Sequence, residues 1–414
     1  MTVLTRIIDQ VIGILIFSYL ILSIIIPSSG YLILTVLILS LFGLMIQRQL
    51  KPIDKDEKIF LFSFIAYFLF SLINIYFFKI DFRELDSVSR FVLVLPIFFY
   101  IRKSSLKANW IAYGFAFAVI VLGVGMISDK LMKITLFEFD KHLGMITLYA
   151  AIFGIASLFF LNKDRSYLSI IIFSVAGFMG VTSILLAGGR GVWIAAILSI
   201  VILNLINQNN WNKLERYLIF FIFIFLFIVS FAIPNSETYH RTKQAYNGLT
   251  EFMVKDEGER DFSKGVSVME RMEMWRAGSL IIKENPFTGV GLNNFKSNIE
   301  KLINEKKISP RIQKFKHPHG QFISAVVEKG ILGLILLIFV IYSPFKVALK
   351  YIKNKRSKEL IPPIAILTTT LIYFFYSFTN GIFAHQNTTL FYALIISVGF
   401  ALMKRDSHQN HSSE

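Results

Sequence analysis

The 414-residue chain contains no cysteine, so disulfide bonds cannot stabilise it and thiols say nothing about its compartment. Charged residues are also scarce, at 17% of the chain, and the centres of its apolar runs contain almost none. A transporter of charged or glycan-linked solutes would instead place ionisable side chains inside such runs. The polar chemistry of this chain is therefore confined to its connecting segments.

Apolar residues dominate the composition, with 55% hydrophobic residues, 42 Phe and a mean hydropathy of +0.60. A run of about 18 apolar residues or more is long enough to cross a bilayer as a helix. The first run shows no small-residue cleavage site after it, so we expect it to be a membrane helix rather than a cleaved signal. We predict an all-α, polytopic membrane protein with about twelve transmembrane helices, near 7–26, 31–46, 59–77, 88–101, 109–127, 143–161, 167–186, 191–206, 217–233, 330–345, 361–378 and 389–403.

The basic residues of the short connections alternate along the chain, which predicts orientation. Alternate connections collect them at Arg48 to Lys58, Arg102 to Lys107, Lys163 and Arg165, Lys213 and Arg216, Lys346 to Lys358, and Lys404 with Arg405. Cytoplasmic loops carry such an excess, so both termini are expected in the cytoplasm. Much of the net charge of +16 is thus explained by orientation signals rather than by nucleic-acid binding, whereas other basic residues lie on the opposite face and need a separate account.

This topology divides the chain into four parts. Residues 1–233 hold helices 1–9, and residues 234–318 form one large, partly helical loop on the outer face, which is periplasmic in a double-membraned bacterium. Residues 319–405 hold a re-entering helix and helices 10–12, and residues 406–414 are expected to be a disordered cytoplasmic tail. The long polar loop is the segment in which we expect the chemistry.

The outer loop contains an amphipathic helix and a glycine-bearing turn. Val268, Met272, Trp275 and Ile282 recur at helical spacing, and Arg271 lies beside this stripe, where it is either a solvated charge or a functional one. Asn285-Pro286 ends the helix. The following Gly289-Val-Gly291 allows close approach of the backbone to a ligand or to another helix, but no strand precedes it as in a nucleotide-binding fingerprint.

The loop closes with His317-Pro318-His319, just before a helix that re-enters the membrane. A neutral imidazole there can accept a proton from a sugar hydroxyl near pH 7. A solvated interfacial histidine is the alternative, and a His-x-His metal pair is a further one, although neither cysteine nor an acidic cluster adjoins it. His319 is therefore a candidate general base.

Arginines near the outer ends of helices are candidate anion ligands. Arg190 follows Leu185-Leu-Ala-Gly-Gly189 in a tight turn, where a guanidinium is confined and suited to bidentate recognition of phosphate. Arg90 and Arg83 lie near the outer end of the fourth predicted helix and are either weaker candidates of the same kind or interface anchors.

Together these motifs resemble the O-antigen ligase family of bacterial inner membranes. The matching features are the Gly-Gly-Arg190-Gly turn, Arg271-Met-Glu-Met-Trp275, Asn285-Pro-Phe-Thr-Gly-Val-Gly291, and His317-Pro-His319 followed by Glu328-Lys-Gly-Ile-Leu-Gly333. The motif-bearing part runs from about 180 to 335, and the remainder matches only in its helix pattern.

The resemblance implies a GT-C-like membrane fold and a metal-independent, cofactor-free glycosyltransferase. Such proteins move a glycan from undecaprenyl pyrophosphate to a terminal sugar of the lipid A core oligosaccharide. Arg190 and Arg271 match the arginines that hold the pyrophosphate, and His319 matches the catalytic histidine. Arg90, His317 and Glu328 are candidate supporting residues. Gly320 departs from the family, where asparagine often follows the histidine.

Rival functions use related chemistry. An O-antigen polymerase would use the same lipid-linked donor with another repeat unit as acceptor. A protein-glycosylating transferase is a third enzyme, although such enzymes often carry C-terminal sequence that this chain lacks. A glycan-lipid transporter is the alternative from a different class, and the apolar centres of the predicted helices disfavour it.

Overall fold

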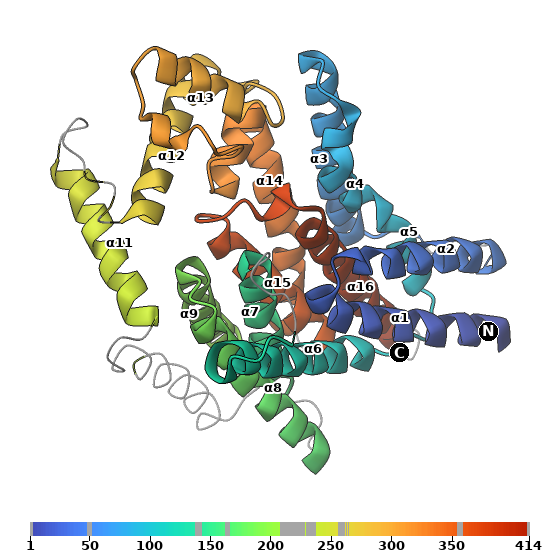
Figure 1. The fold of residues 1–414 in the computed structure, drawn as a ribbon. Helices are drawn as coiled ribbons and strands as arrows, with labels where there is room; N and C mark the ends of the chain where they lie inside the picture. Colours follow the sequence, from blue (N-terminus) through green and yellow to red (C-terminus); the bar gives the residue numbers. More distant parts are fainter. Residues whose placement is uncertain are drawn as a thin grey trace.

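The computed structural model describes residues 3–47, 52–136, 143–161, 166–207, 228, 237–255, 261, 263, 265–353 and 359–411. All regular secondary structure in these ranges is helical, which confirms the all-α prediction for them (Figure 1). Apart from residue 228, the predicted helix 217–233 lies outside these ranges, as does the side chain of Arg190.

Seven of the described helices are long and apolar enough to cross a membrane, so the protein is a polytopic membrane protein. They are α1 (Val3–Ile25), α2 (Gly30–Gln47), α3 (Lys55–Phe78), α6 (Asn109–Ile127), α8 (Tyr167–Leu186), α14 (Gln321–Lys353) and α16 (Gln386–His411). The shorter apolar helices are α7 (Leu143–Phe160), α9 (Arg190–Ile206) and α15 (Ile361–Tyr376). The total of about twelve spans stays a prediction beyond the seven long helices.

Further short helices connect these elements. They are η1 (Pro27–Ser29), η2 (Phe82–Leu85), α4 (Asp86–Leu93), α5 (Leu95–Ile101), η3 (Ser128–Met132), η7 (Pro310–Ile312) and η8 (Ile382–Ala384). The pair α4 and α5 replaces the single helix predicted at 88–101. Pro96 explains the break, because its ring has no N–H to donate and clashes with the preceding turn.

The core of the bundle lies around α16. The most apolar stretch of α16 is 89% buried, whereas that of α2 is only 22% buried. Figure 1 shows α16 and α15 in the middle of the bundle and α2 at its edge. Helices α7 and α8 approach most closely at Gly154 and Gly180, where an added Cβ would meet backbone atoms within 3 Å. Small residues allow this contact, as they do between membrane helices in general.

Helix α16 continues to His411, so helix occupies the positions from Asp406 onward where the sequence predicted a disordered tail. Extending an existing helix adds one hydrogen bond for each residue fixed, which favours continuation past the apolar run. Residues 412–414 lie outside the described ranges.

A polar network ties the basic connections to the end of α16. Arg102 forms a bidentate ion pair with Glu57, at 2.7 and 2.9 Å, and also donates to the Pro52 carbonyl. Lys404 pairs with Asp54 and Asp56 at 2.7 and 3.0 Å. These connections therefore lie together at one end of the bundle, as the alternation of basic loops predicted.

We expect Glu57→Gln to be strongly destabilising. Glu57 is fully buried and Arg102 is 2% exposed, so the substitution leaves a buried guanidinium without its counter-charge. Breaking such a pair costs about 3–5 kcal/mol, and the thermal midpoint of the detergent-solubilised protein should fall by several degrees. Lys307→Gln, which removes an exposed partner of Glu305, is the control and should leave the midpoint unchanged. Equal midpoints for both variants would contradict a stabilising role for the buried pair.

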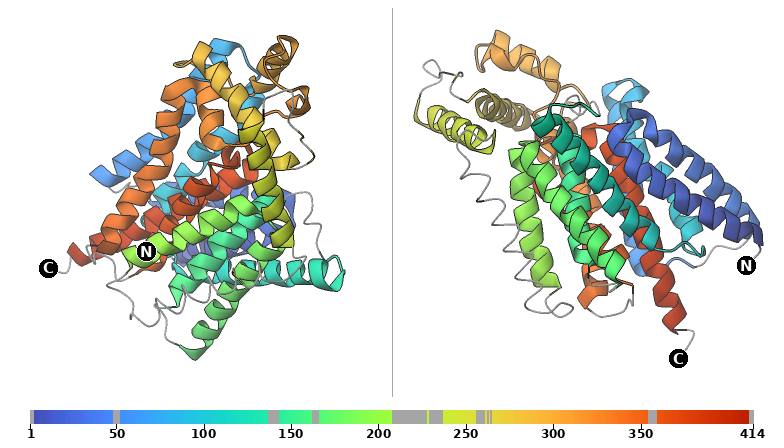
Figure 2. Two further views of the ribbon diagram at one scale, coloured as in Figure 1. Left: turned by 90° about the vertical axis from the view of Figure 1, so that its left-hand side faces the viewer. Right: turned by 60° about the horizontal axis from the view of Figure 1, so that its bottom comes forward.

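The long polar segment folds into a small lobe of its own. Helices α11 (Glu237–Val254), α12 (Val266–Glu284) and α13 (Phe295–Asn304) lie at the end of the molecule opposite to both termini (Figure 2). The apolar core of the lobe consists of Met274, Ala277, Ile281, Phe295, Ile299, Leu302, Ile308, Ile312 and Val327. The helix predicted at 268–282 is confirmed as α12. Its most buried residues are offset from the predicted stripe, because α12 packs against α11, α13 and α14 at once.

The glycine-bearing turn docks this lobe on a kink in α14. Val290 and Gly291 donate their N–H groups to the carbonyls of Val327 and Glu328, at 2.8 and 2.9 Å. Gly289 and Gly330 have φ of 66° and 67°, and a Cβ on Gly330 would lie 2.0 Å from the Phe287 carbonyl oxygen. These glycines therefore allow the turn to approach helix α14 closely. The sequence had left open whether the partner of the turn was a ligand or a helix.

Candidate active site

His319 lies in a short segment between η7 and α14 that is held from two sides. The indole of Trp275 on α12 donates to the Pro318 carbonyl at 3.1 Å. The N–H of Gln321 donates to the carbonyl of Ser377 at 2.7 Å, beyond the end of α15. His319 has a φ of 48°, which a non-glycine residue keeps only where its surroundings fix it. The segment therefore presents the imidazole in a defined place between the lobe and the bundle.

Three imidazole rings gather around this segment. The rings of His317 and His319 are 4.6 Å apart, and those of His317 and His385 are 6.2 Å apart. Phe315 covers the ring of His319 from 5.2 Å. Nowhere in the described ranges do three His, Cys, Asp or Glu side chains form a group that could hold a metal ion. The cluster brings together the predicted pair and a histidine, His385, that the sequence analysis did not single out.

The histidines are held in their neutral form. Burial, together with smaller contributions from the neighbouring His317, Arg271 and His385, lowers the pKa of His319 to about 4. Burial also lowers the pKa of His317, again with a contribution from His385. A neutral imidazole is the form that accepts a proton, so His319 is competent as a base at pH 7.

The pH dependence of the reaction should report this shift. A depressed pKa means that the active, proton-free imidazole persists well below pH 6.5 and is lost as the pH falls through about 4. We therefore expect the acid limb of kcat/KM, which reports the free enzyme, near pH 4. A bound anionic pyrophosphate raises the pKa of the imidazole, so the limb of kcat should lie at higher pH.

Rates measured across pH with a lipid-linked donor would test this expectation. Preparations exposed to acid and returned to pH 7 should regain full activity, which separates titration from unfolding. A kcat/KM limb at the ordinary value of 6.5 would contradict it.

Arg271 on α12 is a cation whose charge acts on His319. Burial lowers its pKa, and the electrostatic influence of Tyr376 opposes this effect. Among the described residues it forms no ion pair, in contrast to Arg276, which lies 3.5 Å from Glu273 on the same helix. The guanidinium remains charged at all working pH values. Arg271 therefore offers an uncompensated charge to an anionic ligand.

Arg190 is the first residue of α9. The backbone of the next residue, Gly191, packs against Thr379 and Tyr376 at the end of α15. A Cβ on Gly191 would lie 2.1 Å from the Thr379 hydroxyl oxygen and 3.2 Å from the Tyr376 ring. The start of α9 thus lies close to Tyr376, which also interacts electrostatically with Arg271. The Arg190 side chain itself lies outside the described residues.

The other predicted arginines are placed differently. Arg90 forms an ion pair with Asp86 at 2.5 Å, so its charge is already compensated. Arg83 is 92% exposed and lies 3.9 Å from Asp81. The structure thus gives no separate support to either as an anion ligand, and the supporting role of Arg90 stays a prediction.

Glu328 belongs to the docking contact rather than to the histidine cluster. Its carboxylate accepts a hydrogen bond from the backbone of Asn293, and its carbonyl accepts one from the amide of Asn74 at 3.3 Å. Asn74 in turn accepts from the N–H of Leu292 at 3.1 Å. Its predicted supporting role would therefore be to position the lobe.

Gly320 has a steric explanation. A Cβ at this position would lie 3.3 Å from the Phe378 carbonyl oxygen and 3.4 Å from the Trp275 indole nitrogen. A larger residue would need these neighbours to move by a few tenths of an ångström. The small residue lets the segment pass between α12 and the end of α15.

A cavity of about 510 Å³ adjoins the cluster, and polar side chains from the connection of α15 to α16 line it. Asn380, His385, Gln386 and Asn387 contribute from this connection, and Gly144 from the start of α7. The Asn380 amide donates to the Tyr376 hydroxyl at 2.8 Å, which links the cavity to the environment of Arg271. The sequence signal for these residues was a histidine and two asparagines in a short outer connection that contains no Lys or Arg.

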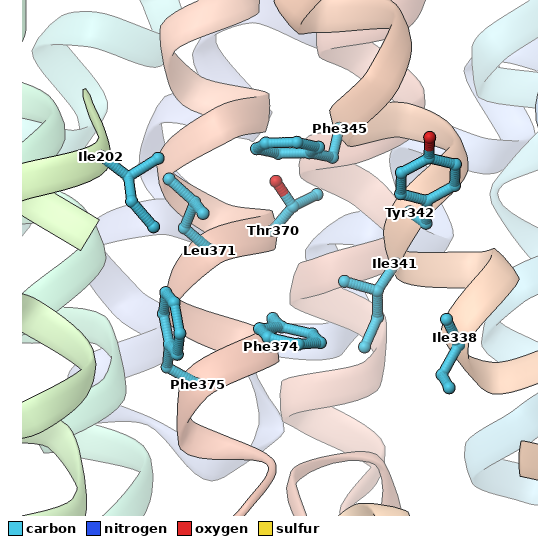
Figure 3. A pocket seen from close by; sticks show the side chains of 9 residues that line it. All are labelled: Ile202, Ile338, Ile341, Tyr342, Phe345, Thr370, Leu371, Phe374 and Phe375. Carbon is cyan, nitrogen blue, oxygen red and sulfur yellow. The ribbon is translucent and has the colours of Figure 1, made fainter. Parts of the chain in front are cut away.

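A second, apolar cavity of about 230 Å³ lies between α9, α14 and α15. Figure 3 shows its lining, which consists of Ile202, Ile338, Ile341, Tyr342, Phe345, Thr370, Leu371, Phe374 and Phe375. Phe374 also contacts Phe322 and Phe378, whose rings lie 5.6 and 5.5 Å away beside the histidine segment. Through Phe374 the apolar lining therefore connects to the aromatic rings beside the histidine segment.

Comparison with known proteins supports the resemblance drawn from the motifs. Residues 175–338 match the family model described as O-antigen ligase, a range that includes Arg190, Arg271 and His319. An uncharacterised protein of Haemophilus influenzae is 23% identical over 386 residues, which cover 91% of this chain and 95% of that protein. The exopolysaccharide production protein ExoQ of Rhizobium meliloti is 37% identical over 88 residues, 20% of either chain. The family prediction is confirmed for the matched range.

Proposed function

We propose that this protein, whose residues 175–338 carry an O-antigen ligase domain, is an O-antigen ligase of the bacterial inner membrane. It takes a glycan from undecaprenyl pyrophosphate and joins it to a terminal sugar of the lipid A core oligosaccharide. The observation that carries the proposal is the histidine cluster, in which the ring of His319 lies 4.6 Å from that of His317, the charge of Arg271 acts on His319, and His385 lines a polar cavity. The imidazole of His319 and the guanidinium of Arg271 are the two groups that such a transfer needs.

The arginines act on the leaving group. As the bond between the anomeric carbon and the phosphate oxygen breaks, negative charge builds up on the pyrophosphate. Cationic donors aimed at that charge stabilise the transition state more than the ground state. Arg271 is held near Tyr376, and the start of α9 brings Arg190 toward the same residue. Two guanidiniums can neutralise the pyrophosphate without a divalent cation, which makes the reaction metal-independent.

His319 acts on the nucleophile. Its neutral ring accepts the proton of the acceptor hydroxyl while the hydroxyl oxygen attacks the anomeric carbon. One C–O bond forms on the side opposite to the bond that breaks, so the configuration at that carbon is inverted. NMR of the product that showed retention would contradict direct displacement.

The apolar cavity suits the polyprenyl chain. Its lining residues lie on α9, α14 and α15, and Phe374 of the lining contacts Phe322 and Phe378 beside the histidine segment. A pyrophosphate bound at Arg271 would thus leave its hydrocarbon chain along an apolar surface, where burial of each CH₂ group contributes about 0.8 kcal/mol. The glycan would extend the other way, into the polar cavity.

The proposed orientation places the lobe in the periplasm and both termini in the cytoplasm. The absence of cysteine makes this simple to test, because single cysteines can be introduced without background. Ser297→Cys on α13 should react with an impermeant maleimide in intact spheroplasts, and Lys107→Cys, between α5 and α6, should react only after lysis. The opposite pattern would place the active site inside the cell and refute the proposal.

Transfer in vitro is the direct test of the function. Purified protein, a defined undecaprenyl-pyrophosphate glycan and a lipid A core acceptor should yield the ligated product, with equal rates in the presence and absence of EDTA. Failure to transfer with a folded, monodisperse preparation would refute the ligase assignment. A rate that required added Mg²⁺ would refute the metal-independent mechanism.

A second candidate function is polymerisation of a lipid-linked glycan. The likeness to a protein named for exopolysaccharide production favours it, because that name refers to making a polysaccharide and not to attaching one to a lipid A core. The donor and the base would be the same, and only the acceptor would differ. Cells that lack a ligase retain polymerised, lipid-linked glycan, whereas cells that lack a polymerase attach single repeats to the core.

A further inference from the structure

His385 is the histidine of the cluster that no motif explains. It lies between η8 and α16, where its carbonyl accepts hydrogen bonds from Thr389, including the backbone N–H at 3.0 Å. The preceding turn is fixed to the histidine segment, because the Gln321 amide oxygen accepts the N–H of Phe383 at 2.8 Å. The position of His385 relative to His319 is therefore set by hydrogen bonds on both sides.

His317 lies between His319 and this connection. Its Nδ1 atom is buried and has no hydrogen-bond partner among the described residues. The atom faces Gly381, since a Cβ built on that glycine would lie 3.7 Å from it. Buried polar atoms are nearly always paired, so an unpaired ring nitrogen at a reaction site calls for a functional explanation. The nitrogen points toward the connection whose next residues line the polar cavity.

The three rings form a continuous path. His319 and His317 are 4.6 Å apart, His317 and His385 are 6.2 Å apart, and His385 itself lines the cavity. Adjacent rings at these separations can pass a proton directly or through one water molecule. The charged and titratable groups that act on the His317–His319 pair are Arg271 of α12 and His385 of the connection, and Tyr376 of α15 acts on Arg271.

We propose that His317 and His385 form a proton relay, which carries the proton taken up by His319 to the polar cavity. The inference rests on the proposed glycosyl transfer. In that step the hydroxyl oxygen bonds to the anomeric carbon, its proton passes to His319, and the pyrophosphate leaves with the electron pair. His319 then passes the proton to His317, which passes it through His385 to solvent in the cavity. His319 is thereby neutral again for the next turnover.

The electrostatics of the cluster favour such a relay. Arg271 and the other two imidazoles disfavour a positive charge on His319, and burial disfavours it more strongly. An imidazolium formed there during transfer is therefore unstable after the anionic product leaves. Passing the charge outward, toward a polar cavity, removes it from a desolvated position beside Arg271.

His317→Gln and His385→Gln test the relay, with His240→Gln on the exposed face of α11 as the matched control. We expect kcat to fall about tenfold or more in each relay variant, with the KM of the lipid-linked donor unchanged. The double variant should lose no more than the stronger single one, because both residues serve one path. Added imidazole should restore part of the rate. The acid limb of the pH profile of kcat should shift in both variants.

Several outcomes would overturn the relay. Rates and pH profiles equal to those of His240→Gln would overturn it. Additive losses of kcat in the double variant, together with a raised KM for the donor, would also overturn it, because they would indicate that the two histidines bind substrate. Thermal midpoints and gel filtration of each variant separate misfolding from loss of proton transfer, and His317→Asn offers a smaller replacement. Should the unmodified protein transfer no glycan, the proposed function itself fails. A wild-type rate that survives both substitutions refutes the relay alone.

Discussion

Replacing His319 by alanine should reduce kcat by about 10²–10⁴-fold, because the acceptor hydroxyl would lose its general base. The structure supports a specific loss of chemistry, since the imidazole is half-buried, neutral and adjacent to Arg271. Membrane insertion and the thermal midpoint should be retained. Transfer measured by the appearance of ligated product, at saturating donor and acceptor, is the required assay.

A second substitution controls for backbone strain at this position. His319 adopts a left-handed conformation, which alanine tolerates less well than asparagine does. His319→Asn therefore keeps the conformation and removes the base, and it should be as inactive as His319→Ala. Normal transfer by either variant would remove His319 from the mechanism. Activity in the asparagine variant only would indicate a structural role.

Replacing Arg271 by glutamine should lower kcat/KM by about 10²–10³-fold, the usual cost of removing one donor that stabilises developing charge. Arg271→Lys should keep part of this activity, since lysine retains the charge but loses the planar fork. A fall in kcat would show that the guanidinium acts mainly in the transition state, whereas a rise in the donor KM would show binding of the ground state. The same pair of substitutions at Arg190 should give losses of the same order.

Arg276→Gln is the matched control for these variants. Arg276 lies on the same helix, but it pairs with Glu273 instead of facing the histidine segment. Its replacement should change kcat/KM by less than about threefold. A full rate in Arg271→Lys would mean that the site needs only a positive charge. A full rate in Arg271→Gln would exclude Arg271 from pyrophosphate recognition.

Much of the fold could be predicted because bilayer-spanning helices are local features of sequence. An apolar run of sufficient length must form a helix, since no water is present to satisfy its backbone. The predictions failed where a local interruption mattered, as at Pro96, which splits one predicted helix into α4 and α5. They also failed where helix continued beyond the apolar run, as in α16 after Asp406.

The candidate site could be predicted only in part. His319 and Arg271 stood out because they belong to short motifs within one polar loop. His385 did not, because it lies 66 positions later in a short connection whose composition resembles that of a plain turn. The role of Gly289 and Gly291 was also undecided in the sequence, and the hydrogen bonds to the kink of α14 identify it as docking.

The sequence by itself determined that this chain crosses a membrane many times and that its polar residues concentrate in one long segment between apolar runs. Both conclusions follow from hydrophobicity and charge, which act locally along the chain. Only the tertiary structure decided which of these side chains meet. The ring contact of His317 with His385, and the electrostatic interaction of Tyr376 with Arg271, join segments far apart in the chain. Packing between distant segments is not encoded in the spacing of neighbouring residues.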